Sequence, residues 1–246
     1  MILGNFKKIV FGLFVGVTCL IIYRYNPYRI EFIGYYDKAF AHRVNNIEKL
    51  NSSLKFFNGV ELDLVFQKNT LDVNHPPAPS ISLNFRDYFN NIPTSKTPFL
   101  WLDIKNLNKE NSNEVLTLLQ SIFEERGYPV NKVLIETSYP EALPIFTKIG
   151  YKTSYYLPYG LRKKTEVELE IEINKIDSIL KKQPDLGISS DYRDYNIMNQ
   201  NFPKKDKYLW MTTSITERWF QETRSILKDE KVKVVLVSYN AIYGNR

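Results

Sequence analysis

Both histidines of this 246-residue chain lie in one short segment, close to acidic residues. His42 precedes Arg43 at the end of an apolar run, and Glu61 and Asp63 follow within a second apolar run. Alternate residues of a β-strand share a face, so Glu61 and Asp63 are expected to point to one side. Two carboxylates on one face suit a divalent cation, and the neighbouring histidine and arginine suit a phosphate ester.

Three further polar residues extend this cluster. His75 lies in a proline-rich loop shortly after the second apolar run, and Asp103 ends a third run that Lys105 follows. Glu61, Asp63 and Asp103 together would supply three oxygens to Mg²⁺ or Ca²⁺ and leave positions for water and a phosphate oxygen. Asp103 and Lys105 could alternatively pair with each other.

The basic side chains of the cluster suit the phosphate ester itself. Arg43 and Lys105 carry positive charge that would balance a phosphoryl group. His42 and His75 would serve as nucleophile or general base and as general acid, on opposite faces of the phosphorus. The alternatives are a structural core histidine at position 42 and an incidental surface histidine at position 75.

Two weaker candidates come from later apolar runs. Glu136 ends the run at 132–136, and Trp210 lies within the run at 208–212. Both are candidate substrate-pocket residues if their strands end at the same edge of the sheet as the earlier ones. Glu136 could instead be a structural acid that satisfies a neighbouring loop.

Apolar runs alternate with amphipathic stretches from about residue 26 onward, which indicates an α/β fold. Eight strands are predicted, at 39–43, 59–66, 99–104, 132–136, 153–157, 186–190, 208–212 and 232–237. This pattern favours a (β/α)₈ TIM-type barrel, with a doubly wound sheet as the alternative. In such a barrel the active site lies at the carboxyl ends of the strands, where the polar candidates fall.

The N-terminus carries an uncharged apolar run at residues 9–23, with two lysines before it and Arg24 after it. The run is short for a spanning helix but typical of the hydrophobic region of a signal peptide. No Ala-x-Ala cleavage site follows, so we predict an uncleaved membrane anchor over residues 1–25, ahead of one barrel domain over residues 26–246. A cleaved signal and a buried core helix are the alternatives. The flanking charges weakly favour an extracytoplasmic catalytic domain.

Composition narrows the functional classes further. The net charge is +6, but the lysines and arginines are scattered and no nucleic-acid-binding motif accompanies them, so no nucleic-acid partner is expected. Cys19, the only cysteine, lies inside the N-terminal apolar run. This excludes an intramolecular disulfide and excludes thiol catalysis by the domain that follows.

The order of these motifs resembles that of a known enzyme family. Ala-His-Arg at 41–43, Gly-Val-Glu-Leu-Asp at 59–63, His75 and Leu-Asp-Ile-Lys at 102–105 are similar to the motifs of glycerophosphodiester phosphodiesterases. More broadly, they resemble the barrel superfamily that includes phosphatidylinositol-specific phospholipase C and the sphingomyelinase D-type venom enzymes. Tyr-Leu-Trp-Met-Thr at 208–212 is similar to the seventh strand of the family, which commonly carries a tryptophan.

The resemblance implies acid–base cleavage of a phosphodiester, in which a neighbouring substrate hydroxyl often attacks first and forms a cyclic phosphate. It assigns the catalytic histidine roles to the two histidines, the metal to the three carboxylates, and the phosphate to Arg43 and Lys105. The chain departs from the family pattern at Val44, where glycine is usual, at Asp103, where glutamate is usual, and at Pro76, where aspartate is usual. The Pro-Glu-Asn-Thr motif is also missing. These departures bear on the substrate more than on the phosphodiester chemistry.

Three functions are compatible with the sequence. The first is a metal-dependent phosphodiester hydrolase acting on a small glycerophosphodiester, a lipid headgroup or a phosphodiester-linked surface polymer. The second is a lyase or transferase that uses the same site and forms a cyclic phosphate. The third is a non-catalytic barrel that binds a phosphorylated glycan or lipid.

Overall fold

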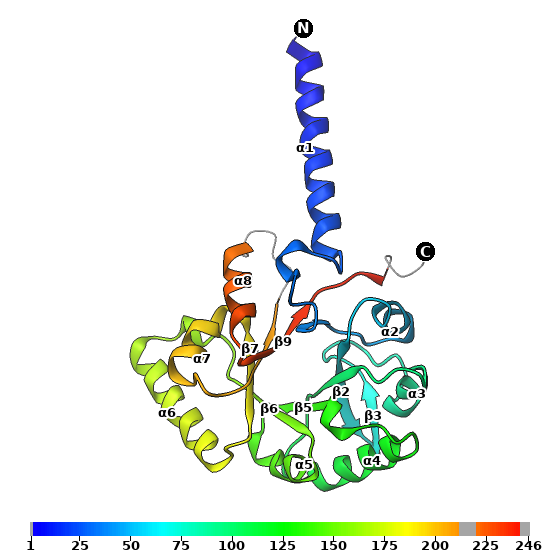
Figure 1. Cartoon of the computed structure of the whole chain (residues 1–246), viewed down its shortest axis with the longest axis vertical. Coiled ribbons are helices and arrows are strands. Elements are labelled where there is room, and N and C mark those ends of the chain that lie inside the picture. The colour runs from blue at the N-terminus through cyan, green and yellow to red at the C-terminus, as the bar shows by residue number, and fades with distance from the viewer. Residues whose placement is uncertain (1, 212–219, 242–246) are drawn as a thin grey trace.

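Eight parallel strands close into a barrel in the computed structural model, which describes residues 2–211 and 220–241 (Figure 1). Neighbours follow the order β1-β9-β8-β7-β6-β5-β4-β2, and Ala41 of β1 pairs with Val60 of β2 to complete the circle. The barrel strands are β1 (Ala39–Ala41), β2 (Gly59–Gln67), β4 (Phe99–Ile104), β5 (Val133–Thr137), β6 (Lys152–Tyr156), β7 (Gly187–Asp191), β8 (Lys207–Trp210) and β9 (Val232–Val237). The closing pair confirms the predicted barrel and excludes the doubly wound sheet.

One strand lies outside the barrel. β3 (Thr70–Val73) folds back antiparallel on the end of β2, with Leu64 opposite Val73. The hairpin turn places Lys68 and Asn69 at φ values of 48° and 58°, a left-handed conformation that asparagine adopts more readily than most residues. This hairpin delivers His75 back toward the end of β2.

Helices surround the barrel on its outer side (Figure 1). They are α2 (Ile47–Ser53), α3 (Phe85–Asn90), α4 (Ser112–Glu124), α5 (Pro144–Ile149), α6 (Glu166–Lys182), α7 (Tyr195–Asn201) and α8 (Phe220–Lys228). Short 3₁₀ turns supplement them: η1 (Ile30–Phe32), η2 (Val130–Lys132), η3 (Pro140–Ala142), η4 (Leu161–Lys163) and η5 (Tyr192–Asp194). The sequence also predicts a helix at 215–227; its first residues lie outside the described part of the chain, and α8 is the part that the structure describes.

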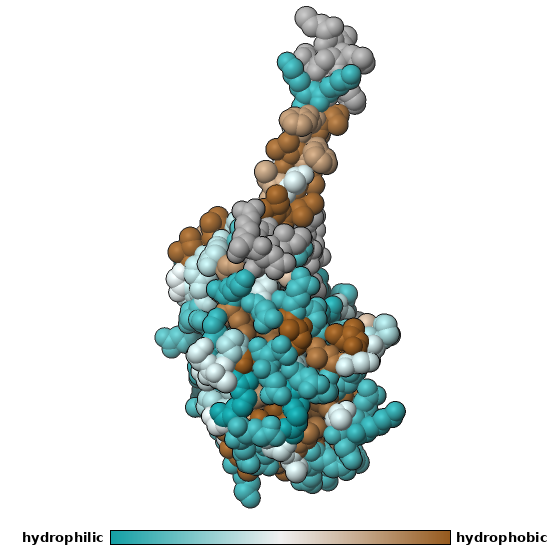
Figure 2. All heavy atoms as spheres, turned by 90° about the vertical axis from the view of Figure 1, so that its right-hand side faces the viewer, coloured by the Kyte–Doolittle hydropathy of each residue, from teal (hydrophilic) through white to brown (hydrophobic). Residues whose placement is uncertain are grey.

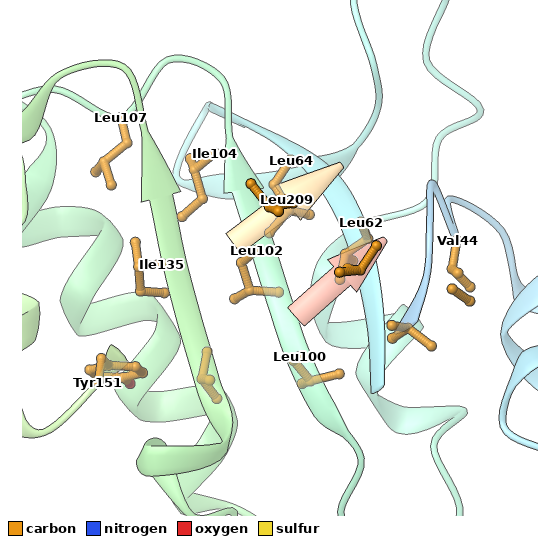
Figure 3. Packing of buried hydrophobic residues seen from close by; sticks show 14 of the residues in the cluster. Val44, Leu62, Leu64, Leu100, Leu102, Ile104, Leu107, Ile135, Tyr151 and Leu209 are labelled. Atoms are coloured by element: carbon orange, nitrogen blue, oxygen red, sulfur yellow. The ribbon is translucent and has the colours of Figure 1, made fainter. Parts of the chain in front are cut away.

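Strand alternation divides the buried side chains into two layers. Leu62 and Leu102 point outward and pack between the barrel and its helices, as Figure 3 shows for this layer. Trp101 points inward and joins a separate apolar cluster that fills the barrel interior, together with Phe40, Leu134, Tyr208, Val234 and Leu236. Because Glu61 is in register with Trp101 and Asp63 with Asp103, the carboxylates of β2 also face the interior.

The N-terminal segment forms α1 (Ile2–Tyr25), which projects away from the barrel (Figure 1). Its described apolar side chains are exposed, and Figure 2 shows them as a brown column beyond the largely teal barrel. The hydroxyl of Tyr23 donates to Glu31 at 2.5 Å and accepts the Ile30 N–H at 3.1 Å, which ties the end of the helix to η1.

None of the helices, taken over the residues described, combines the length and the apolar character that crossing a bilayer requires.

Candidate active site

A cavity of about 360 Å³ opens at the carboxyl ends of the barrel strands. It brings together all nine residues singled out in the sequence: His42, Arg43, Glu61, Asp63, His75, Asp103, Lys105, Glu136 and Trp210. They come from β2, β4, β5 and β8 and from the loops that follow β1, β3 and β4. Parallel strands end at one rim of a barrel, which is why residues up to 168 positions apart in the sequence meet there.

Three carboxylates converge at one end of this cavity. Glu61, Asp63 and Asp103 each offer one oxygen, and these three oxygens all lie within 4.8 Å of one another. A shared cation at ligand distances of about 2.3–2.6 Å requires separations of this size. The donor set, three hard carboxylate oxygens, fits Mg²⁺ or Ca²⁺ and does not distinguish between them.

Burial and mutual repulsion make this carboxylate cluster electrostatically costly. Desolvation raises the pKa of Glu61 well above its usual value, and the charges of Asp63 and Asp103 raise it further. Desolvation also raises the pKa of Asp103, although Lys105 opposes that shift. A bound cation would relieve both effects, because it favours the ionised form of each carboxylate.

Lys105 lies against the carboxylates and not on the open side of the cavity. Its Nζ is 2.6 Å from Oδ1 of Asp63 and also donates to Asp103. Burial alone would lower the pKa of Lys105, but the two aspartates outweigh it and the pKa is raised. The structure therefore shows Lys105 as the counter-ion of two acids, while its contact with phosphate remains a prediction.

The two histidines flank the same carboxylates. Nε2 of His42 lies 3.7 Å from Oε2 of Glu61, and Nε2 of His75 lies 3.9 Å from Oδ1 of Asp63. Burial, followed by the charge of Arg43, lowers the pKa of His42 to about 3, so its imidazole is neutral at physiological pH. A neutral imidazole has a nitrogen that can accept a proton, but a pKa this low makes it a weak base, and the negative charge of a bound phosphate would raise that pKa.

Arg43 connects the second histidine to the carboxylate cluster. Its Nη2 lies 3.1 Å from Nε2 of His75. A guanidinium can only donate, so Nε2 accepts and the proton of a neutral His75 resides on Nδ1. The Arg43 side chain is exposed, which leaves its other donors open to an anionic ligand.

The loop between β1 and α2 orients the carboxylates of β2. Arg43 adopts a φ of 52°, and its backbone N–H donates to Oε2 of Glu61 at 2.6 Å. Asn45 holds Asp63 at two points: its Nδ2 donates to Oδ2 at 2.7 Å, and its Oδ1 accepts the Asp63 N–H at 2.9 Å. Asn45 was not identified from the sequence, although it stands where the usual family motif is missing.

Lys49 supports this loop from α2. Its Nζ donates to the carbonyl oxygens of His42 and Arg43 at 2.7 and 3.0 Å. These bonds fix the left-handed turn at Arg43, a position that is costly for a side chain with a Cβ. Lys49 also lines the cavity, and a lysine one turn into a helix gave no signal that could have identified it in the sequence.

The opposite end of the cavity is aromatic. Trp210 lies nearly parallel to Tyr156 and Tyr159, with ring centroids 6.4 and 6.2 Å away and interplanar angles of 20° and 10°. Ser238 and Tyr239 also line the cavity. The sequence singled out only Trp210 from this group, because tyrosines are frequent throughout the chain.

Glu136 lines the cavity, and both of its carboxyl oxygens form hydrogen bonds with residues of the barrel strands. Trp101 Nε1 donates to its Oε2 at 2.8 Å, and the hydroxyl of Ser189 is hydrogen-bonded to its Oε1. Desolvation, and then the charge of Asp103, raise the pKa of Glu136 to about 8. Glu136 is therefore largely protonated at neutral pH and adds little charge to the cavity.

Solved structures with the same barrel fold include several phosphodiesterases. A glycerophosphodiester phosphodiesterase from Thermotoga maritima aligns with a TM-score of 0.55 at 15% identity, over 81% of this chain and 93% of its own. An Oleispira antarctica phosphodiesterase, solved with its product sn-glycerol-3-phosphate, aligns with a TM-score of 0.56 at 10% identity, over 86% and 96% of the two chains. A Galdieria sulphuraria protein with a provisional glycerophosphodiester phosphodiesterase assignment aligns with a TM-score of 0.57 at 14% identity, over 82% of this chain and 94% of its own.

No protein-family model and no curated protein sequence matches the chain. At identities of 10–15% the structural matches establish the fold, an eight-stranded barrel of the type used by glycerophosphodiester phosphodiesterases. These three alignments cover 93–96% of the other chains.

Proposed function

We propose that this protein is a metal-dependent phosphodiesterase of the glycerophosphodiester phosphodiesterase type. The observation that carries the proposal is the convergence of Glu61, Asp63 and Asp103 within 4.8 Å, at the catalytic rim of a barrel that known phosphodiesterases share. Two histidines and an arginine in the same cavity supply the remaining functional groups.

The carboxylates Glu61, Asp63 and Asp103 would hold Mg²⁺ or Ca²⁺. Such an ion polarises a phosphoryl oxygen and stabilises the negative charge that develops in the transition state. The β1–α2 loop positions two of the ligands before any ion binds, because Arg43 N–H and Asn45 already hold them. Preorganised ligands of this kind lower the cost of assembling the site.

His42 and His75 would move the protons. His42 is neutral and lies beside the carboxylates, so it can take a proton from the attacking hydroxyl or water. His75 is more exposed, and after gaining a proton it can protonate the leaving alcohol. Arg43 and Lys105 would neutralise the phosphate, and for this Lys105 must release part of its contact with the two aspartates.

Turnover and its metal dependence test the proposal directly. The full-length chain should hydrolyse bis(p-nitrophenyl) phosphate with Mg²⁺ or Ca²⁺ and lose that activity with EDTA and in His42→Ala. Activity that survives both changes would overturn it. Phosphorus NMR on a natural-type diester then distinguishes a linear phosphomonoester, the product of hydrolysis, from a cyclic phosphate. Metal binding without turnover would support the non-catalytic alternative.

We also propose that residues 1–25 attach the protein to a membrane, with the barrel on the extracytoplasmic side. The exposed apolar side chains of α1 support attachment, since Phe11, Leu13 and Phe14 are each about two-thirds exposed (66–69%). Exposed apolar surface of this extent favours transfer out of water. Fractionation of cells that express the full chain, followed by protease treatment of intact cells, would test both parts.

A further inference from the structure

The aromatic end of the cavity continues from the barrel interior to the outer rim. We call Tyr156, Trp210 and Tyr159 the aromatic wall. Tyr156 and Trp210 are partly buried and line the cavity, whereas Tyr159 is 57% exposed and continues the wall outside it. Trp210 lies nearly parallel to both tyrosines, so the three rings have closely aligned planes.

Polar groups on and beside this wall have no partner in the described part of the chain. The indole Nε1 of Trp210 is buried and makes no hydrogen bond there. The hydroxyls of Tyr156 and Ser238 likewise make none to another described residue. The two hydroxyls can donate to a ligand that carries oxygen acceptors. The indole N–H is out of contact with solvent, so it can reach such a ligand only after a shift of the side chain.

Charge at the wall disfavours a cationic ligand group. Lys163 Nζ lies 5.6 Å from the ring centroid of Tyr159 and already occupies one cation–π position. Glu136, the carboxyl group nearest to this end among the described cavity residues, has both oxygens engaged by Trp101 and Ser189. A quaternary ammonium would therefore be repelled by Lys163 and would have no free carboxylate to pair with. It also has no acceptor for the hydrogen-bond donors of the cavity.

A sugar ring suits the aromatic rings and the hydrogen-bond donors, and it needs no carboxylate partner. Its C–H face stacks on the negative face of aromatic rings, and its hydroxyls accept hydrogen bonds from indole and tyrosine donors. Trp210 and Tyr159 have ring centroids 6.2 Å apart, and a sugar ring offers a larger C–H face to such a pair than the three carbons of glycerol do. The extension of the wall to the rim thus favours a ring over a three-carbon chain.

We propose that the aromatic wall binds a sugar ring, so that the substrate is a phosphodiester in which at least one of the two alcohols is a sugar. This deepens the proposed function and rests on it. In the hydrolytic step a water oxygen bonds to phosphorus, the bond from phosphorus to one alcohol oxygen breaks, and that oxygen receives a proton. The products are one phosphomonoester and one free alcohol.

Binding of product-type ligands tests the inference without turnover. Isothermal titration calorimetry with Mg²⁺ present would compare three hexose 1-phosphates (glucose, galactose and N-acetylglucosamine) with phosphocholine, sn-glycerol 3-phosphate and inorganic phosphate. At least one hexose 1-phosphate should bind about tenfold tighter than the other ligands, which corresponds to about 1.4 kcal/mol. Tyr159→Ala should remove most of that preference, and Tyr159→Phe should retain it because the ring remains.

Tyr139→Ala is the matched control, since Tyr139 is 47% exposed and does not line the cavity. It should leave every affinity unchanged. Equal or tighter binding of phosphocholine, or an unchanged hexose preference in Tyr159→Ala, would overturn the inference. Failure of the proposed function gives a different result: the protein hydrolyses no diester in the presence of metal, regardless of how tightly the hexose 1-phosphates bind. Binding of inorganic phosphate alone would support a phosphate site and overturn the sugar site.

Discussion

The two ends of the cavity satisfy their polar groups in opposite ways. At the carboxylate cluster, Lys105 neutralises Asp63 and Asp103, while Asn45 and a backbone N–H hold the acids in place. At the aromatic wall, by contrast, the indole of Trp210 has no partner among the described residues. The aspartates at one end thus have hydrogen-bond partners within the chain, whereas the indole at the other end has none among the described residues.

This difference separates chemistry from specificity. Groups that are preorganised before a ligand arrives are suited to stabilising charge that develops during reaction. Donors that gain a partner only from the ligand are suited to selecting it, because a wrong ligand leaves them unsatisfied. Variants at the carboxylate cluster should therefore abolish turnover, whereas variants at the wall should change which ligand binds.

The largest effect is expected from Asp63→Asn, which removes a charged ligand from the centre of the cluster. We expect the rate of diester hydrolysis to fall about 10⁴-fold, because metal-ion stabilisation contributes several kcal/mol to the transition state. Calorimetric titration with Mg²⁺ and Ca²⁺ should show the matching loss of binding. Asp185→Asn, an exposed aspartate at the opposite end of the barrel, is the control. Unchanged metal binding in Asp63→Asn would contradict the ligand assignment.

His42→Ala should reduce the rate about 10³-fold, a typical contribution of a positioned general base. Metal binding should persist, because the imidazole lies beside the carboxylates and is not one of the three converging ligands. Steady-state kinetics and metal titration on the same preparation would separate the two effects. Equal losses of metal affinity and rate would show that His42 acts through the cluster and not on protons.

Asn45→Ala should weaken metal affinity by roughly 10–100-fold, the usual cost of losing a residue that orients a metal ligand. The carboxylate of Asp63 would lose its 2.7 Å bond and gain rotational freedom. Metal titration is the primary measurement, with Asn51→Ala, an exposed asparagine on α2, as the matched variant. Raising the metal concentration should restore most of the activity, an outcome not expected if Asn45 acted on the substrate.

Glu136→Gln gives the smallest expected change in rate and a specific change in stability. Because the folded-state pKa is about 8 and the unfolded value about 4.5, the folded protein retains a proton that the unfolded chain releases in between. This contribution to stability therefore declines as the pH rises from about 4.5 to 8. The amide keeps both hydrogen bonds and cannot ionise, so thermal unfolding of the variant should depend less on pH. If the unfolding temperatures of the variant and the unchanged protein vary with pH in the same way between pH 4.5 and 8, the raised pKa is contradicted.

Much of the fold could be predicted because its signals are local. Alternation along residues 59–66 placed Glu61 and Asp63 on one face with Leu62 on the other, and the structure confirms this arrangement. The number of strands followed from the spacing of apolar runs. The hairpin strand β3 had a weaker signal, since a strand of four residues depends on what it packs against.

The sequence by itself determined which residues carry charge, which of them end a strand, and therefore which chemistry the rim can perform. Only the tertiary structure decided their pairing. The register between β2 and β4 put Asp103 beside Asp63, with Lys105 bound to both, and the β1–α2 loop brought Asn45 onto Asp63. It also set Tyr159 parallel to Trp210, fifty-one positions away. Such contacts depend on strand register and loop conformation, which are fixed by the packing of the whole barrel and not by any short stretch of chain.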